Sequence, residues 1–408
     1  MQLFGIGYQP EVILESDVIR LGGDRNLTTI EWDVEGPSGT EVQLQTRTGN
    51  TLLPDTLYFK TDGSQTSFDT YYSKTTIRAK QQGEKRLVFN LGPDWSAWSA
   101  PYTEAKSSPI TSPSPRQFML MRASMLSDTP DAAATLKAIR LNFSDPVANQ
   151  LLGAVIPGRI DALGEPLPFT FFLRPEESRG FNELLLTAPS GMTIAHNVMY
   201  AGKEEDLQDG VDMSGLALDA TPAATGQDSL HLKFSSVSAD SELIRLEFEG
   251  TVFSLGGQLR AFVRQADANG EGTWQRVDPE PQNPTSLHVV AIAESGELLS
   301  DLRILPPVVT PNDDGVNEEA IIDFAVFLAN LDNAVEVSIH DLSGRLVRTI
   351  RELRSSSAGR YAIPWNGRDD AGKLVPPGMY TVLVTVDAST QGADVSGKSL
   401  LSTIAVTY

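Results

Sequence analysis

The chain has 408 residues, of which 40% are hydrophobic, so it can form folded domains with sizeable cores and is not a disordered protein. Asp and Glu total 53 against 32 Lys and Arg, and the formal net charge of -21 argues against binding to nucleic acid or to an anionic membrane surface, both of which require basic patches. Because the chain has no cysteine, disulfides, thiolate metal sites and cysteine nucleophiles are excluded.

The sequence gives no sign of membrane insertion. No apolar run approaches the roughly 20 residues of a membrane helix. The first ten residues lack the basic start and the apolar core of a signal peptide. If the protein is exported, we expect this sequence to be its mature or trimmed chain.

The sequence pattern of residues 1–145 predicts β-strands. Apolar and polar residues alternate with a period of two in the stretches that we predict as strands, residues 27–34, 41–47, 116–122 and 136–143, and a short apolar run covers residues 12–14. Gly36-Pro-Ser-Gly39 lies between the first two strands and predicts a hairpin turn. Residues 60–90 are polar and predict a long excursion from the sheet.

An aromatic turn precedes the strand at residues 116–122. It begins with Trp95-Ser-Ala-Trp98, continues to Tyr102 and is followed by a Pro- and Ser-rich run. This order resembles the bacterial relatives of discoidin-type, galactose-binding-like jelly rolls. The resemblance implies a jelly-roll-like sandwich that binds glycans, with Trp95, Trp98 and Tyr102 as a stacking platform. We favour the alternative that both tryptophans close the end of the sandwich, because large aromatic side chains are usually buried.

Residues 146–304 predict a second antiparallel β-sandwich of undefined subtype. Its strand-like stretches are residues 168–174, 183–187, 230–234, 242–248, 258–264 and 287–292. Asp267, Asn269 and Glu271 surround Gly270 at alternate positions, as in a partial calcium loop. A polar hairpin tip explains this pattern equally well.

An acidic loop at residues 310–319 opens a third domain, residues 305–408, directly after Pro306 and Pro307. Six oxygen-bearing side chains surround Gly315: Asn312, Asp313, Asp314, Asn317, Glu318 and Glu319. Such a loop can gather hard oxygen ligands around Ca²⁺, although its spacing is not that of an EF-hand. A solvated acidic turn at the start of a strand fits the same residues.

The C-terminal residues carry a specific pattern. Residues 335–341 alternate strictly, Ser343-Gly344 forms a turn, and later strands are predicted near residues 375–386 and 400–407. The pattern is carried by four stretches in order, residues 310–317, 340–348, 365–369 and 372–380. It resembles the immunoglobulin-like domain that flagellar hook-capping proteins share with C-terminal modules of many secreted bacterial proteins.

This resemblance implies an immunoglobulin-like sandwich. Trp365 is expected in the core, and Arg368 and Asp369 are expected to tie the following loop to neighbouring backbone. Family members more often have Asn-Gly-Asp-Gly where Asn312-Asp-Asp-Gly315 stands here, which leaves the metal question open. The rest of the chain does not resemble a hook-capping protein, so that specific role is not implied.

The sequence shows no catalytic motif, and we predict that the chain is not an enzyme. Its four histidines lie far apart, at positions 196, 231, 288 and 340, and no phosphate-cradling loop or nucleophile elbow is present. Carboxylates are abundant and leave a glycosidase pair open, but they concentrate in turn-like loops, where acidity is ordinary.

The sequence thus predicts an all-β chain of three consecutive β-sandwich domains: jelly-roll-like, of undefined subtype, and immunoglobulin-like. We expect a non-catalytic, extracellular or cell-surface bacterial protein with a structural or adhesive role, as a repeating subunit of a surface assembly or filament stiffened by calcium. Its partners would be other surface-protein subunits or further copies of itself, joined through exposed strand edges. Two alternatives stay open: glycan binding by the N-terminal domain, and a non-catalytic portion of a larger secreted enzyme.

Overall fold

β-Strands form nearly all of the regular structure, which confirms the predicted all-β fold class. The computed structural model describes residues 7–72, 82–189, 191–226, 228–237, 241–292, 298–312, 314–327, 335–354, 357–386 and 399–408. The chain divides into two compact units, Met1–Gln150 (unit 1) and Leu151–Tyr408 (unit 2). The three domain limits predicted from the sequence stay a prediction.

Unit 1 is organised by one long strand that takes part in two sheets. The strands of its sandwich are β1 (Glu11–Glu15), β2 (Ile19–Glu35), β3 (Thr40–Gly49), β7 (Ser108–Pro109), β8 (Arg116–Ser127) and β9 (Thr135–Ser144). The start of β2 pairs with β8, which also pairs with β1 and β3, whereas the rest of β2 pairs with β9 and β7. Gly22 and Gly23, whose positive φ angles of 77° and 131° favour glycine, lie where the β2–β8 register breaks between Arg20 and Arg25, and β9 becomes the partner from Asn26 onward.

The alternating side chains of these strands meet in one core. Ile30, Leu44 and Met119 are completely buried, and Trp32 is 3% exposed. The turn at residues 36–39 is present, but the hairpin predicted there is wrong, because β3 pairs with β8 and not with β2. The turn therefore connects strands with different partners, a feature that local turn chemistry does not reveal.

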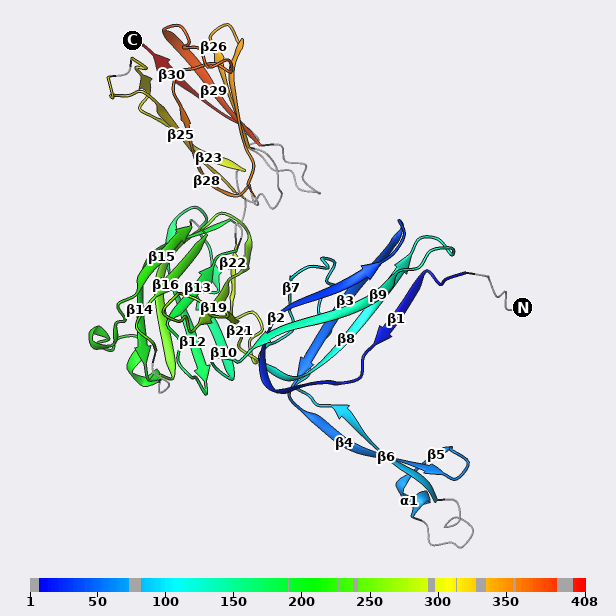
Figure 1. The fold of residues 1–408 in the computed structure, drawn as a ribbon. Coiled ribbons are helices and arrows are strands. Elements are labelled where there is room, and N and C mark those ends of the chain that lie inside the picture. Colours follow the sequence, from blue (N-terminus) through cyan, green and yellow to red (C-terminus); the bar gives the residue numbers. More distant parts are fainter. Residues whose placement is uncertain are drawn as a thin grey trace. The chain divides into compact units, whose positions relative to one another are not determined.

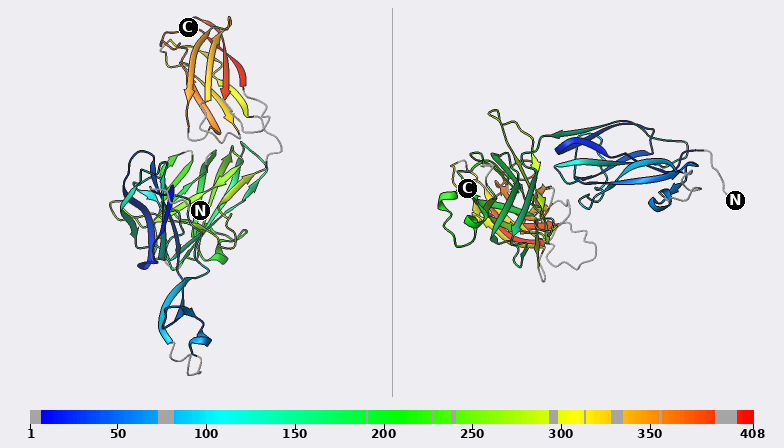
Figure 2. Two further views of the ribbon diagram at one scale, coloured as in Figure 1. Left: turned by 90° about the vertical axis from the view of Figure 1, so that its right-hand side faces the viewer. Right: turned by 90° about the horizontal axis from the view of Figure 1, so that it is seen from below.

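The predicted excursion near residues 60–90 is a separate arm that projects from the sandwich of unit 1 (Figure 1; the left view of Figure 2 shows it from another side). Its elements are β4 (Leu52–Lys60), β5 (Gln65–Thr66), α1 (Phe68–Tyr71) and β6 (Gln82–Leu91), with the strands in the order β5-β4-β6. Ser67 caps α1 by accepting a hydrogen bond from the Thr70 N–H. Tyr58 packs against Phe68 and Tyr71 with ring centroids 5.7 and 5.0 Å apart, so aromatic contacts hold the helix against the arm.

The first part of unit 2 is built from three sheets. Their strands are β10 (Gln150–Ile156), β11 (Arg159–Ile160), β12 (Pro166–Glu176), β13 (Glu183–Thr187), β14 (Met192–Gly202), β15 (Thr221–Gly226), β16 (Ser229–Lys233), β17 (Leu243–Val252), β18 (Gly256–Gln258), β19 (Arg260–Arg264), β20 (Gln275–Arg276), β21 (Asp278–Pro279) and β22 (His288–Ala291), with two 3-10 turns, η1 (Glu204–Leu207) and η2 (Ser214–Leu216). The sheet orders are β14-β17-β12-β10-β21, β15-β16-β13-β19-β20 and β11-β22-β18.

Strand β12 shows why these residues form a half-buried strand. Phe169, Phe171 and Leu173 are buried, whereas the residues between them are only partly covered. Phe169 stacks on Phe248 of the neighbouring strand β17 with ring centroids 5.6 Å apart. Burying side chains of this size contributes about 1.5–3 kcal/mol each, so β12 is a main source of stability in this part of unit 2.

The last part of unit 2 has two sheets, with orders β23-β25-β28 and β24-β30-β29-β26-β27. Their strands are β23 (Leu299–Leu305), β24 (Val308–Val309), β25 (Ala320–Val326), β26 (Val335–Asp341), β27 (Leu346–Glu352), β28 (Gly359–Trp365), β29 (Gly378–Val386) and β30 (Ser399–Val406). Along β28, Tyr361, Ile363 and Trp365 are buried and alternate with exposed residues. On β26, the stretch with strict alternation in the sequence, Val335, Val337 and Ile339 are buried as the core face, but Ser338 of the other face is buried as well.

Candidate functional site

The predicted acidic loop at residues 310–319 is a turn closed by its own side chains. The Asp314 carboxylate accepts a hydrogen bond from the Val316 N–H at 2.8 Å, and Glu318 accepts one from the Gly315 N–H at 3.2 Å. Asn312 Oδ1 accepts from the Asp314 N–H at 3.1 Å. Asn317 adopts a positive φ of 54°, and Asp313 lies outside the described residues. The loop thus brings Asn312, Asp314 and Glu318 together around its backbone.

The second predicted loop, at residues 267–271, is a closed hairpin tip. Asp267 Oδ1 accepts hydrogen bonds from the backbone N–H groups of Asn269 and Glu271, both at 2.9 Å. These backbone hydrogen bonds, first the one from Glu271 and then the one from Asn269, hold the pKa of Asp267 below its usual value. Gly270 has a φ of 79°, the conformation that this turn requires.

Two further hairpin tips repeat this arrangement. Asp341 Oδ1 accepts from the N–H groups two and four residues later, at 2.9 and 3.1 Å, and Asp369 Oδ1 does the same at 3.0 and 2.8 Å. Gly344 and Gly372 have positive φ angles of 83° and 79°. The three tips share the sequence Asp-x-x-Gly. The short carboxylate of the aspartate accepts the two backbone hydrogen bonds, and the glycine adopts the positive φ. The loop contact of Asp369 was expected from the family pattern, whereas that of Asp341 was not.

Trp95 and Trp98 are half-buried and already have partners. The Arg122 and Arg47 guanidinium groups lie 4.3 and 4.9 Å from the centroid of the Trp98 ring. Trp95 Nε1 donates a hydrogen bond to the Thr51 carbonyl at 2.7 Å. Both rings therefore lie against the sandwich. A sugar would have to stack on the Trp98 ring, which two arginine side chains already contact.

Tyr102 is a core residue of unit 1, which differs from its expected place in a sugar-stacking surface. Its side chain is 6% exposed, and its hydroxyl pairs with the Thr46 hydroxyl at 2.9 Å and accepts from the Thr111 N–H at 3.0 Å. Ser96 and Ser99 hold the intervening segment along β3 through their backbone N–H groups, which donate to strand carbonyls at 2.9 and 2.8 Å. The three predicted residues thus do not form one exposed platform.

A buried charge cluster on β13 was not found from the sequence. The Glu183 carboxylate is 3% exposed, and it contacts His231 Nε2 at 2.8 Å and the Arg264 guanidinium at 2.7 Å. Trp274 covers the cluster, with the Arg264 guanidinium 4.4 Å from its ring centroid. Burial raises the pKa of Glu183, but hydrogen bonds from His231 and Arg264 outweigh burial and lower its pKa below the usual value.

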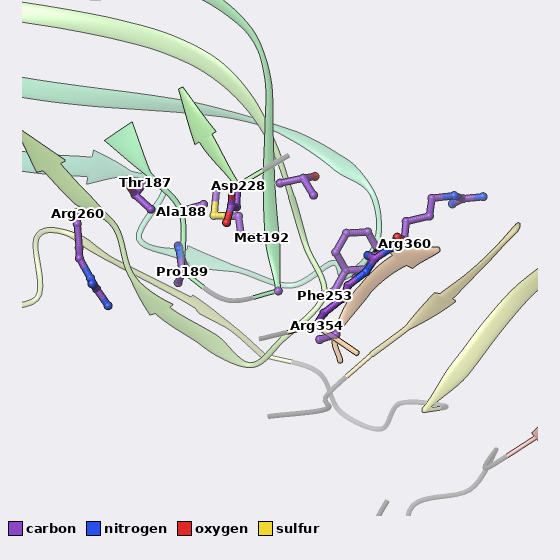
Figure 3. Close-up of a pocket in the computed structure, with 13 residues that line it drawn as sticks. Thr187, Ala188, Pro189, Met192, Asp228, Phe253, Arg260, Arg354 and Arg360 are labelled. Carbon is purple, nitrogen blue, oxygen red and sulfur yellow. Dashed lines mark hydrogen bonds between the residues drawn. The ribbon is translucent and has the colours of Figure 1, made fainter. Parts of the chain in front are cut away.

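A polar hollow of about 440 Å³ lies in unit 2. Figure 3 shows Arg260 on one side of it and Arg354 and Arg360 on the other. Arg360 binds the Asp323 carboxylate through two hydrogen bonds of 2.9 and 2.7 Å, and Arg354 binds Glu352 at 2.7 Å. Two of the three cations are therefore already neutralised, and the hollow has no strong preference for an anion.

Residues 314–391 match the family model of the FlgD Ig-like domain. This match confirms the resemblance of the C-terminal domain that the sequence predicted. The matched segment is much less than half of the chain, so it identifies the FlgD Ig-like domain and not the whole protein. No curated protein matches the chain.

Similar solved structures include bacterial proteins with low identity. Dimeric latent PorU from Porphyromonas gingivalis is 12% identical, with 97% of this chain and 34% of that chain covered and a TM-score of 0.23. The BSP domain of a biofilm associated protein is 9% identical, with 100% and 83% covered and a TM-score of 0.19. The chain thus spans about a third of the PorU chain, and scores this low carry no argument about topology or function.

The FlgD Ig-like domain has its tryptophan where the sequence predicted it. Trp365 is 2% exposed, its ring lies 5.7 Å from that of Tyr380, and its Nε1 donates to the Arg368 carbonyl at 2.9 Å. The Arg368 guanidinium donates to the Gly372 carbonyl at 3.1 Å, and Asp369 closes the same loop. The predicted packing of Trp365 and the loop contacts of Arg368 and Asp369 are confirmed.

The last strand of the chain, β30, follows the matched segment and has only a short partner on one side. β30 pairs with β29 along its length, from Ser399 to Val406. On its other side, β24 pairs only with Ala405 and Val406. Among the strands that the structure describes, no other strand forms ladder hydrogen bonds with that side of β30, so residues 399–404 are unpaired there, and β23 lies close to β30 without pairing with it.

Two kinds of feature are absent from the described ranges. None of the helices in these ranges has the length and apolar character needed to cross a membrane. Nor do three or more His, Cys, Asp or Glu side chains converge there as a metal-binding group.

Proposed function

We propose that the chain is a non-catalytic structural or adhesive protein of a bacterial surface, which associates with copies of itself by strand addition to β30. Its sandwich architecture and the FlgD Ig-like domain at residues 314–391 support a structural role. The open edge of β30 is the observation that carries the proposal. An unpaired strand edge is a template for a strand of another chain unless it is covered or blocked.

The backbone geometry identifies which groups face the open side. The N–H groups of Ala405 and Thr407 donate to the carbonyls of Pro307 and Val309, both at 3.0 Å. Backbone groups alternate in direction along a strand, so the N–H and C=O of Leu401 and Thr403 face this same side, beyond the end of β24. A strand added there would form main-chain hydrogen bonds with these two residues and continue the sheet.

The side chain of Leu401 adds an apolar contribution at the same place. The Leu401 side chain is 67% exposed, whereas that of Ile404, three residues later in the same strand, is completely buried in the core. An added strand can cover part of Leu401, and burying apolar area contributes roughly 25 cal/mol per Å². Neither proline nor a charged side chain occupies residues 399–404, the devices that commonly protect strand edges from pairing.

The test removes one backbone donor from the open edge. In Thr403→Pro, the N–H that faces the open side is lost, while the hydrogen bonds between β29 and β30 stay intact. The matched control is Thr403→Val, which keeps the N–H. We expect sedimentation to show a mass that rises with concentration for the native chain and for Thr403→Val, but not for Thr403→Pro. Equal association of the two variants at unchanged melting temperature would refute strand addition at this edge.

Calcium stiffening is a finer part of the proposal and rests on the acidic loops. Asn312, Asp314 and Glu318 supply oxygen atoms at one turn, and Asp267 supplies them at another. Hard oxygen ligands of this kind suit Ca²⁺, and a bound ion stabilises the folded state by mass action. We expect Ca²⁺ to raise the melting temperature and Asp314→Asn to remove part of the rise. An identical melt with calcium and with chelator would remove calcium from the account.

A further inference from the structure

The outer face of one sheet in unit 2 forms the floor of a second hollow, of about 470 Å³. Phe172 on β12 and Arg245 on β17 are directly opposite each other in the strand register, so their side chains lie on the same face. Arg174 follows two residues after Phe172 and shares this face. The half-buried Phe172 ring lines the base of the hollow, and the Arg245 guanidinium lies 5.7 Å from the centroid of this ring.

Two loops form the walls of the hollow, and arginines fasten both walls to the floor. Arg174 donates to Glu280 of one wall and to Glu204 of the other, both at 2.7 Å. Arg245 donates to the Leu207 carbonyl at 3.0 Å and to the Asp209 carboxylate at 2.7 Å. The Arg245 side chain is 9% exposed whereas that of Asp209 is 92% exposed, so the bond to the Leu207 carbonyl is the one that is shielded from water. The walls are thus held in place before any ligand arrives.

The lining favours an uncharged ligand with many hydroxyl groups. Two guanidinium groups are balanced by three carboxylates in the lining, Glu204, Asp209 and Glu280, so an anion gains no net attraction. One oxygen of each carboxylate holds an arginine, which leaves the second oxygen to accept a hydrogen bond. Exposed amide side chains lie at Gln208 and Asn283, one on each wall; Asn283 Oδ1 accepts from the Thr285 hydroxyl at 2.9 Å, and its NH2 group can donate to a ligand.

We propose that this hollow, with Phe172 as its floor, binds a neutral saccharide. Sugar hydroxyls donate to the carboxylates and exchange hydrogen bonds with the amides of Gln208 and Asn283, while the apolar face of the sugar ring packs on Phe172. The volume lies within the range of roughly 300–1,000 Å³ that is usual for small-molecule sites, which suits a mono- or disaccharide. This site belongs to unit 2 and is independent of the tryptophans of unit 1.

The test uses the full chain and saturation-transfer NMR. The probes are glucose, galactose, mannose, N-acetylglucosamine and their disaccharides, with galacturonate as an anionic counterpart. The test variant is Gln208→Ala with Asn283→Ala, because both residues are exposed and neither fastens a wall to the floor. Trp98→Ala is the control for a site in unit 1. Melting curves confirm that each variant is folded.

We expect a neutral sugar to give a signal with the native chain and with Trp98→Ala. The double variant should lower its affinity by roughly tenfold or more, since two hydrogen-bonding side chains are lost. Phe172→Ala should also abolish the signal in a folded protein. The proposal is overturned if no neutral sugar binds, if galacturonate binds equally well, or if only Trp98→Ala removes binding. Strand addition at β30 is tested by sedimentation and saccharide binding by NMR, so one proposal can be refuted while the other is supported.

Discussion

The buried carboxylate of Glu183 should be essential to the stability of its sheet, and Glu183→Gln tests this. Glu183 is 3% exposed, and its side chain joins three neighbouring strands through His231 and Arg264. Glutamine keeps the shape and one acceptor oxygen but removes the charge. Arg264, whose side chain is 15% exposed, is then left without a full counter-charge.

The expected loss follows from the energetics of buried ion pairs. Removing one partner of such a pair costs about 3–5 kcal/mol, because the remaining charge stays desolvated. Glutamine still accepts one hydrogen bond, and Lys233 is half-exposed and regains water, so the lower end of this range applies. We therefore expect Glu183→Gln to lower the free energy of opening of the sheet by about 3 kcal/mol.

Native-state hydrogen exchange of the β13, β16 and β19 amides measures this loss locally. The matched control is Asp33→Asn, which removes an exposed ion pair with Arg140 in unit 1 and should change exchange little. Because the pKa of Glu183 is lowered in the folded state, its contribution is present above the usual Glu pKa and is lost as the pH falls below about 4. The native chain and the variant should therefore converge in acid. A loss below about 1 kcal/mol, or one equal to the control, would refute the reasoning.

Three further predictions concern the FlgD Ig-like domain. Hydrogen bonds from the Ser343 hydroxyl and the Arg345 N–H lower the pKa of Asp341 to about 2. The hairpin tip at residues 341–345 should therefore loosen only as the pH falls from about 4 towards 2. An NMR titration of the Asp341 carboxyl with an ordinary midpoint would contradict this prediction. Gly344→Ala should lower the free energy of unfolding, measured in urea, by about 1–2 kcal/mol, because a φ of 83° strains any residue with a side chain even though the space around Gly344 is open. Gly378→Ala is the control: Gly378 also lies in open space but has no positive φ, so its replacement should lower the free energy of unfolding much less. Phe324→Ala should cost about 3–5 kcal/mol, since the ring is completely buried and stacks on Tyr361 at 5.1 Å; a loss near that of an exposed substitution would show that the core collapses around the gap.

Local sequence signals predicted the strands and turns well. The hairpin between β26 and β27 follows from the strict alternation over residues 335–341 and the Ser343-Gly344 turn, and Trp365 lies in the core as the family pattern implied. These features depend on neighbours within a few residues, which the sequence displays directly. The turn at residues 36–39 shows the limit, because turn chemistry does not say which strands pair afterwards.

The groupings of functional interest depend on contacts that are distant in the sequence. Glu183 meets His231 and Arg264 only because β13 lies between β16 and β19 in a particular register. Arg174 likewise links Glu204 and Glu280, residues from loops that the sheet brings to one face. Periodicity cannot reveal such partners. Tyr102 shows the converse, since an aromatic residue in an exposed-looking turn is a core residue whose hydroxyl is satisfied internally.

Hydrogen exchange at the open edge of β30 tests the central claim most directly. The N–H groups of Leu401 and Thr403 face the side on which β24 pairs only with Ala405 and Val406. If strand addition joins copies of the chain, exchange at these two amides should slow as the protein concentration rises, while the amides that bond β29 stay equally protected throughout. Exchange at Leu401 and Thr403 that is independent of concentration, in samples whose mass does increase, would contradict assembly through this edge.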